Sequence, residues 1–136
     1  MASTLKINTL TGVTTAGSIA VTGEGNSTTT NLQQGLCKVW VNYTGITSTA
    51  ERDSFNVSSL SDVGTGQTTI NIANDMANAN YSGFYYSNAH TSSSYSTFAN
   101  HFTGGFGDFT TSNFKQNAHN NSDGVDSFMN LTGIFG

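Results

Sequence analysis

The chain has 136 residues, a formal net charge of −4 and only 9% charged residues, and serine, threonine, asparagine and glycine make up about half of it. Because these residues are poor helix formers and favour turns and strands, the composition predicts one all-β domain with an additional arm. Four scattered basic residues are too few for a nucleic-acid surface. No apolar run is long enough to insert into a membrane, and the first residues lack a signal-peptide core, so we expect a protein that is made in a cytoplasm and not secreted.

Residues 1–35 are poor in hydrophobic side chains. Five apolar residues there are candidate attachment residues: Leu5, Ile7, Leu10, Ile19 and Val21. This content cannot offset the cost of ordering the backbone, roughly 1–2 kcal/mol for each residue. We therefore expect an extended N-terminal β arm that orders by strand addition to other copies or to another protein, with disorder as the alternative.

Residues 36–74 give the strongest strand signal. In the first run, alternation places three residues on one apolar face: Val39, Val41 and Tyr43. Two further runs, 53–60 and 68–73, repeat the pattern, and a glycine turn at 64–66 lies between them. The sequence predicts three consecutive antiparallel strands, a β-meander, within an antiparallel β-sandwich-like head formed by residues 36–136.

After this stretch, Met76 is expected to plug the core from a short connection. The closing segment, 128–136, is predicted to be a strand tied into the sheet. Cys37 is the chain's single cysteine, and we expect it to be buried filler.

Ten of the fifteen aromatic residues fall between residues 81 and 122. Tyrosine mixed with serine, asparagine and glycine is typical of binding loops. The candidate contact residues for a host surface are Tyr85, Tyr86, Asn88, His90 and Tyr95. Most phenylalanines are expected to lie in the core. Alternatively, they fill an interface between subunits, where burial of each is worth roughly 1.5–3 kcal/mol.

Catalytic and metal sites are not expected. Glu51 and Asp53 flank Arg52 and would face the same way on a strand, as a glycosidase carboxylate pair requires, but a solvated strand edge explains them better. His90, His101 and His119 lack the short spacing of metal ligands, although a site on a threefold axis stays open. We expect no cofactor.

The sequence resembles a known family in several ordered runs. Residues 35–43, 52–59, 64–66 and 76–81 resemble the C-terminal domain of tail-fibre-like virion proteins of marine tailed bacteriophages, including cyanophages. The closing Gly133-Ile134-Phe135-Gly136 is similar to the way those chains end. Residues 3–10, 15–19 and 22–25 are similar to the attachment segments that precede such domains.

The resemblance implies a homotrimeric, β-rich virion appendage. Residues 1–35 would bind other virion proteins, and residues 36–136 would bind a host glycan or an outer-membrane protein, without catalysis. The alternative is a capsid decoration or head-fibre (cement) protein. A weaker alternative is a small polysaccharide depolymerase that uses Glu51 and Asp53.

Overall fold

The computed structural model describes residues 4–13, 19–23, 25, 28–46, 48–88, 106–120, 123–124 and 126–136. The chain divides into two compact units, Met1–Leu36 and Cys37–Gly136. Apart from one four-residue helix, the regular structure of these described residues consists of antiparallel β-strands, which confirms the all-β prediction. Among the described residues, no helix has the length and apolar character needed to span a membrane.

The first unit contains a small β-hairpin and a single helical turn. Strand β1 (Ala20–Thr22) pairs with β2 (Thr29–Asn31), and α1 (Leu32–Gly35) follows directly. Asn31 caps the helix, because its Oδ1 accepts a hydrogen bond from the Gln34 N–H at 3.1 Å. None of the unit's described residues is buried. The ordering of this segment against a partner stays a prediction.

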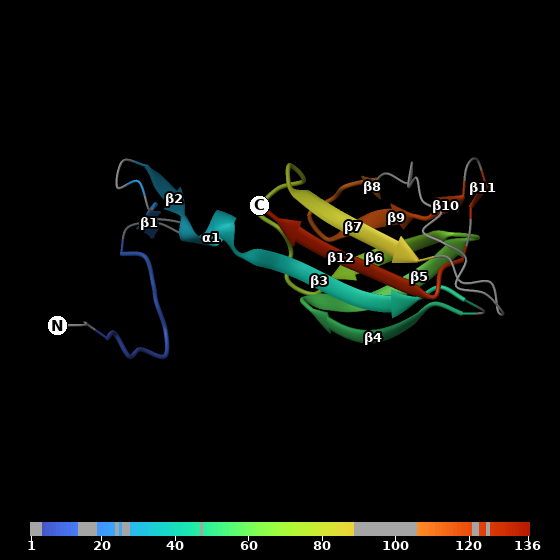
Figure 1. The fold of residues 1–136 in the computed structure, drawn as a ribbon, viewed down its shortest axis with the longest axis horizontal. Coiled ribbons are helices and arrows are strands. Elements are labelled where there is room, and N and C mark those ends of the chain that lie inside the picture. Colours follow the sequence, from blue (N-terminus) through green and yellow to red (C-terminus); the bar gives the residue numbers. More distant parts are fainter. Residues whose placement is uncertain are drawn as a thin grey trace. The chain divides into compact units, whose positions relative to one another are not determined.

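The second unit is built from two four-stranded sheets (Figure 1). The first sheet has the order β4 (Ala50–Phe55), β3 (Cys37–Thr44), β12 (Met129–Phe135) and β7 (Ser82–Asn88). The second has the order β5 (Val57–Gly64), β6 (Gln67–Ile72), β9 (Asn113–Asn117) and β8 (Phe106–Gly107). A further short pair joins β10 (His119–Asn120) and β11 (Asp123–Gly124). The closing strand β12 lies between β3 and β7, which confirms that the segment is tied into the sheet.

The two sheets share one hydrophobic core. Its buried residues come from both sheets and from the connection before β7: Val39, Val41, Tyr43, Ile70, Ile72, Met76, Tyr81, Phe114 and Ile134. The predicted burial of Met76 is confirmed. Cys37, in contrast, is only half-buried at the start of β3.

The predicted three-stranded meander is wrong, because residues 53–60 form two strands. Asn56 has a φ of 59° and separates β4 in the first sheet from β5 in the second. Its amide Nδ2 donates to the carbonyl oxygens of Lys38 and Asn74, each at 3.1 Å. Its Oδ1 accepts from the Asn74 N–H at 2.7 Å. Asparagine tolerates this left-handed conformation, so the chain changes sheets here without glycine.

The inward-facing residues change from apolar to polar along the strands. The change runs from Val39 to Tyr43 in β3, from Ile134 to Asn130 in β12, from Ile72 to Thr68 in β6 and from Phe114 to Gln116 in β9. Thr132 in β12 donates a hydrogen bond to the side-chain oxygen of Gln116 across the two sheets. The interior is therefore apolar where β3 begins and polar where it ends.

Candidate functional site

An exposed row of aromatic residues crosses the first sheet on its outer surface. Trp40 lies opposite Phe55 on one side and opposite Gly133 on the other, and Gly133 lies opposite Phe84. Val39 and Val41 point into the core, so alternation turns Trp40 and its row outward. The exposed fractions are 53% for Phe55, 37% for Trp40 and 60% for Phe84. The row spans three gaps between strands, roughly 14 Å.

Phe84 reaches over the glycine of the central strand. A Cβ placed on Gly133 would stand 2.5 Å from Cζ of Phe84, so the far end of the ring covers this position. The ring also lies beside Phe135, with the two centroids 6.0 Å apart. Gly133 thus leaves the space that lets the aromatic row continue from β3 to β7.

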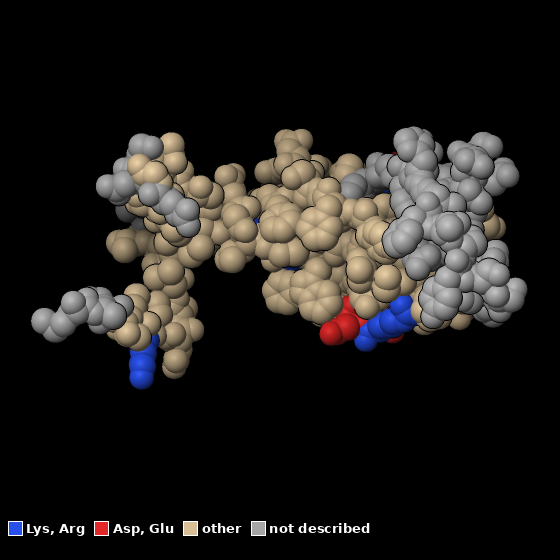
Figure 2. Space-filling model, viewed as in Figure 1, with Lys and Arg blue, Asp and Glu red and all other residues tan. Residues whose placement is uncertain are grey.

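We call the surface formed by Trp40, Phe55, Phe84, Tyr86, Leu131 and Phe135 the outer aromatic face. Tyr86 and Leu131 pair directly with each other in the row beside Phe84 and Gly133. Strands β7 and β12 contain no charged residue. Figure 2 shows the surface over these strands almost without charged side chains, which gather instead along β4. An uncharged aromatic surface of this kind is suited to packing against a partner.

Arg52, on the edge strand β4 beside this face, is already engaged. Arg52 donates through Nη2 to the carbonyl oxygen of Phe128 at 2.7 Å and through Nη1 to Oδ1 of Asn42 at 3.4 Å. Its guanidinium carbon also lies 4.5 Å from the centroid of the Phe128 ring. Arg52 therefore links the edge strand β4 to Asn42 of β3 and to Phe128. An anionic ligand would have to compete with these contacts for the guanidinium.

The tyrosines predicted to bind a host surface separate onto two faces. Tyr86 is 38% exposed and belongs to the outer aromatic face. Tyr85 is half-buried on the inner side of β7, its hydroxyl is buried, and burial raises its pKa to about 12. The expected exposure of Tyr85 is not found, because alternation turns it inward, and its role as a contact residue stays a prediction. The side chain of Asn88, and all of His90 and Tyr95, lie outside the described residues.

Four of the five candidate attachment residues are exposed within a single chain: Leu5, Ile7, Leu10 and Val21. Ile19 is half-buried, and its carbonyl oxygen accepts a hydrogen bond from the Leu32 N–H at 2.8 Å. Their role in attachment stays a prediction.

The predicted carboxylate pair does not form. A register shift between Asn42 and Tyr43 sets Asp53 opposite Asn42 on the outer side and Glu51 opposite the core-facing Tyr43. The two carboxylates therefore do not share a face, and the expectation that they would is wrong. Glu51 instead accepts a hydrogen bond from the Ser54 hydroxyl at 2.7 Å.

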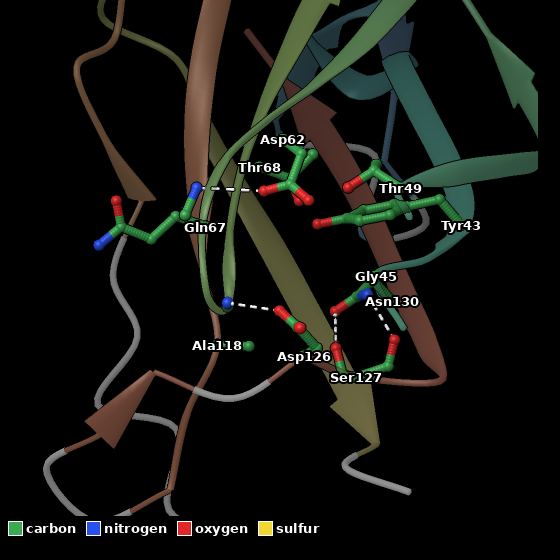
Figure 3. Close-up of a pocket in the computed structure, with 12 residues that line it drawn as sticks. Tyr43, Gly45, Thr49, Asp62, Gln67, Thr68, Ala118, Asp126, Ser127 and Asn130 are labelled. Carbon is green, nitrogen blue, oxygen red and sulfur yellow. Dashed lines mark hydrogen bonds between the residues drawn. The ribbon is translucent and has the colours of Figure 1, made fainter. Parts of the chain in front are cut away.

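A polar pocket lies where the interior becomes polar, beside the turn between β5 and β6 (Figure 3). It is partly open to solvent, and its cavity volume of about 10 Å³ leaves room for roughly one water molecule. Two carboxylates on its wall hold this turn: Asp62 accepts from the Gly64 N–H at 3.1 Å and Asp126 from the Gly66 N–H at 2.8 Å. Burial also raises the pKa of the Tyr43 hydroxyl there. These bonds give both acids a structural role.

Metal ligands do not gather in the part of the chain that the structure describes, where no three histidine, cysteine, aspartate or glutamate side chains form a cluster. His90 and His101 lie outside that part, and only the backbone of His119 is described. The pocket's two carboxylates bind backbone amides of one turn, as Figure 3 shows.

The chain was compared with protein-family models, curated proteins and solved structures, and none of them matches. The residues of the outer aromatic face therefore carry the functional argument. Sequence reasoning missed Trp40 and Phe55 as site residues, and it included Phe84 only in the alternative that the phenylalanines of 81–122 fill an interface between subunits. The alternation of residues 39–43 could have identified Trp40, because it places this side chain on the face opposite the valines.

Proposed function

We propose that this chain is a structural subunit of a bacteriophage virion, a tail-fibre-like trimeric appendage that binds the host surface without catalysis. The resemblance of the sequence runs supports the virion assignment. The single observation that carries the trimeric part of the proposal is the outer aromatic face, which a lone chain leaves exposed on β3, β4 and β7. Large contiguous apolar patches on soluble proteins usually mark interaction sites.

In this proposal the two units have different tasks. The first unit, with its exposed apolar residues, attaches the subunit to other virion proteins. The second unit is the head, whose target is a host glycan or an outer-membrane protein. Each contact is weak, and many copies on one particle give avidity.

A capsid decoration protein is the second candidate. The exposure of Leu5, Ile7 and Leu10 favours it, since such a segment could staple neighbouring capsid subunits as well as a tail. The depolymerase is not retained, because Glu51 and Asp53 face opposite sides of the sheet.

Cryo-electron microscopy of the virion that carries this chain tests the proposal. We expect density for the head in threefold groups on a tail appendage, with its free end directed outward. Density on the capsid lattice would reject the tail assignment and support the decoration protein. Excess purified protein should also slow adsorption of that phage to its host, and unchanged adsorption would contradict host binding.

A further inference from the structure

We infer that the outer aromatic face is where copies of this chain pack against one another. The occupant of the face is thus a second copy, and the host target binds elsewhere on the head. The inference rests on the oligomeric part of the proposed function and names the surface that makes the oligomer.

The distribution of charge favours a copy of the same chain. Each copy carries a net charge of −4, so two copies repel unless they meet where acidic groups are absent. Across the four strands of the first sheet, the acidic residues are Glu51 and Asp53, both on the edge strand β4. The remaining three strands carry Lys38 alone, whose long stem can lie along an apolar surface.

The face begins directly after the first unit in the chain, and this position also favours a second copy as its occupant. Strand β3 starts at Cys37, immediately after the first unit ends at Leu36, which is itself an exposed apolar residue. Trp40 follows only four residues later. If copies join through their first units, the covalent link brings this end of each β3 close to its counterparts. The head domains are then tethered at a high effective concentration, so covering a face next to the link costs little additional translational and rotational entropy.

The packing of the rings makes association favourable. Phe84 is held over Gly133 and beside Phe135, so little side-chain freedom is lost when a partner covers it. Covering a side chain of this kind completely is worth roughly 1.5–3 kcal/mol, and aromatic residues are enriched at the centres of protein interfaces.

A neutral glycan is the competing occupant, since sugar rings can stack on aromatic rings. It would also need polar partners for its hydroxyl groups. Beside the row, however, Oδ1 of Asn42 already accepts from Arg52 at 3.4 Å, and Oδ1 of Asp53 accepts from the Ser54 N–H at 2.9 Å. Because β7 and β12 also carry no charged residue that could bind sugar hydroxyls, the face favours an apolar protein surface over a sugar.

The chain offers a direct probe, because Trp40 is its only tryptophan and lies in the centre of the row. The experiment combines light-scattering mass with quenching of Trp40 fluorescence by acrylamide, a neutral quencher that the protein's negative charge does not repel. We expect a multiple of the 14.3 kDa chain mass and a Trp40 that is shielded from acrylamide. On dilution, the quenching of Trp40 by acrylamide should rise as the light-scattering mass falls.

Two variants and one matched control locate the interface. Phe84→Glu and Phe55→Glu place a carboxylate in the face, on two different strands, and should increase quenching of Trp40 several-fold. Val63→Glu makes the same kind of change on β5 in the second sheet, at a side chain that is 50% exposed, and should behave as wild type. Circular dichroism of all three variants confirms that they fold.

Each outcome decides the inference. A wild-type monomer, or an oligomer whose Trp40 is as accessible as in the Phe84→Glu variant, overturns it. So does a monomer whose Trp40 becomes shielded only on addition of the neutral polysaccharides dextran or laminarin. A dimer with shielded Trp40 upholds the face and contradicts the proposed trimer, which separates the two claims.

Discussion

Phe84 lies over Gly133 so closely that a Cβ at position 133 would stand 2.5 Å from its Cζ. The two residues are direct partners on β7 and β12, in the row that also contains Trp40. The absence of a side chain at this one position gives the ring its place on the sheet. The continuity of the outer aromatic face therefore depends on a glycine at position 133.

Replacement of Gly133 by alanine tests this dependence. The new methyl group would push the Phe84 ring aside, and an exposed ring can move. We therefore expect the monomer's free energy of unfolding to change by less than about 1 kcal/mol. Association between copies should weaken at least several-fold, measured as the dilution at which the light-scattering mass falls. An unchanged dilution midpoint would show that the ring's position is unimportant.

The change of sheets at Asn56 leads to a second prediction. Asn56→Ala loses the bonds to Lys38 and Asn74 and keeps a strained φ of 59°, so we expect a loss of about 2–4 kcal/mol in urea unfolding. Asn56→Gly removes the same bonds but relieves the strain, and should be the less damaging of the two. Equal losses would mean that backbone strain contributes little.

Sequence reasoning located β3, β6 and β12 as separate strands, and in β3 the strict alternation of Val39, Val41 and Tyr43 survives in the structure. It joined β4 and β5 into one strand, since nothing in the pattern of 53–60 shows that Asn56 adopts a positive φ. The sequence pattern also does not show the register shift in β4, which places Glu51 and Asp53 on opposite faces instead of the same face. The aromatic face joins the consecutive strands β3 and β4 to β7 and β12, which are far away in the chain, so only the pairing of β12 with β3 and β7 reveals it.

The buried hydroxyl of Tyr85 predicts how stability depends on pH. Burial raises the pKa of Tyr85 from 10.0 to about 12, so between these values the unfolded chain loses its proton first. The folded state keeps this contribution in full below about pH 10 and loses up to about 3 kcal/mol as the pH rises through this range. Tyr85→Phe should flatten the fall, measured by urea unfolding at pH 9 and pH 11. An equally steep fall in the variant would assign the effect to other groups, such as Tyr43, whose pKa is also raised.

Phe114 on β9 should be the most sensitive position in the core. Its ring is fully buried and meets Tyr81 in an edge-to-face contact with centroids 6.3 Å apart. Phe114→Ala removes this packing and leaves a cavity, so we expect a loss of about 3–5 kcal/mol in the free energy of unfolding. Phe128→Ala, at an exposed ring that contacts Arg52, serves as the control and should cost about 1 kcal/mol or less. Comparable losses at the two positions would contradict the assignment of the core.

Acrylamide quenching of Trp40 in the wild-type oligomer decides whether another copy of the chain covers the outer aromatic face. We expect a shielded tryptophan that becomes accessible to acrylamide on dilution, in step with the fall in mass. A tryptophan that stays freely quenched at every concentration, whatever the mass, would contradict it.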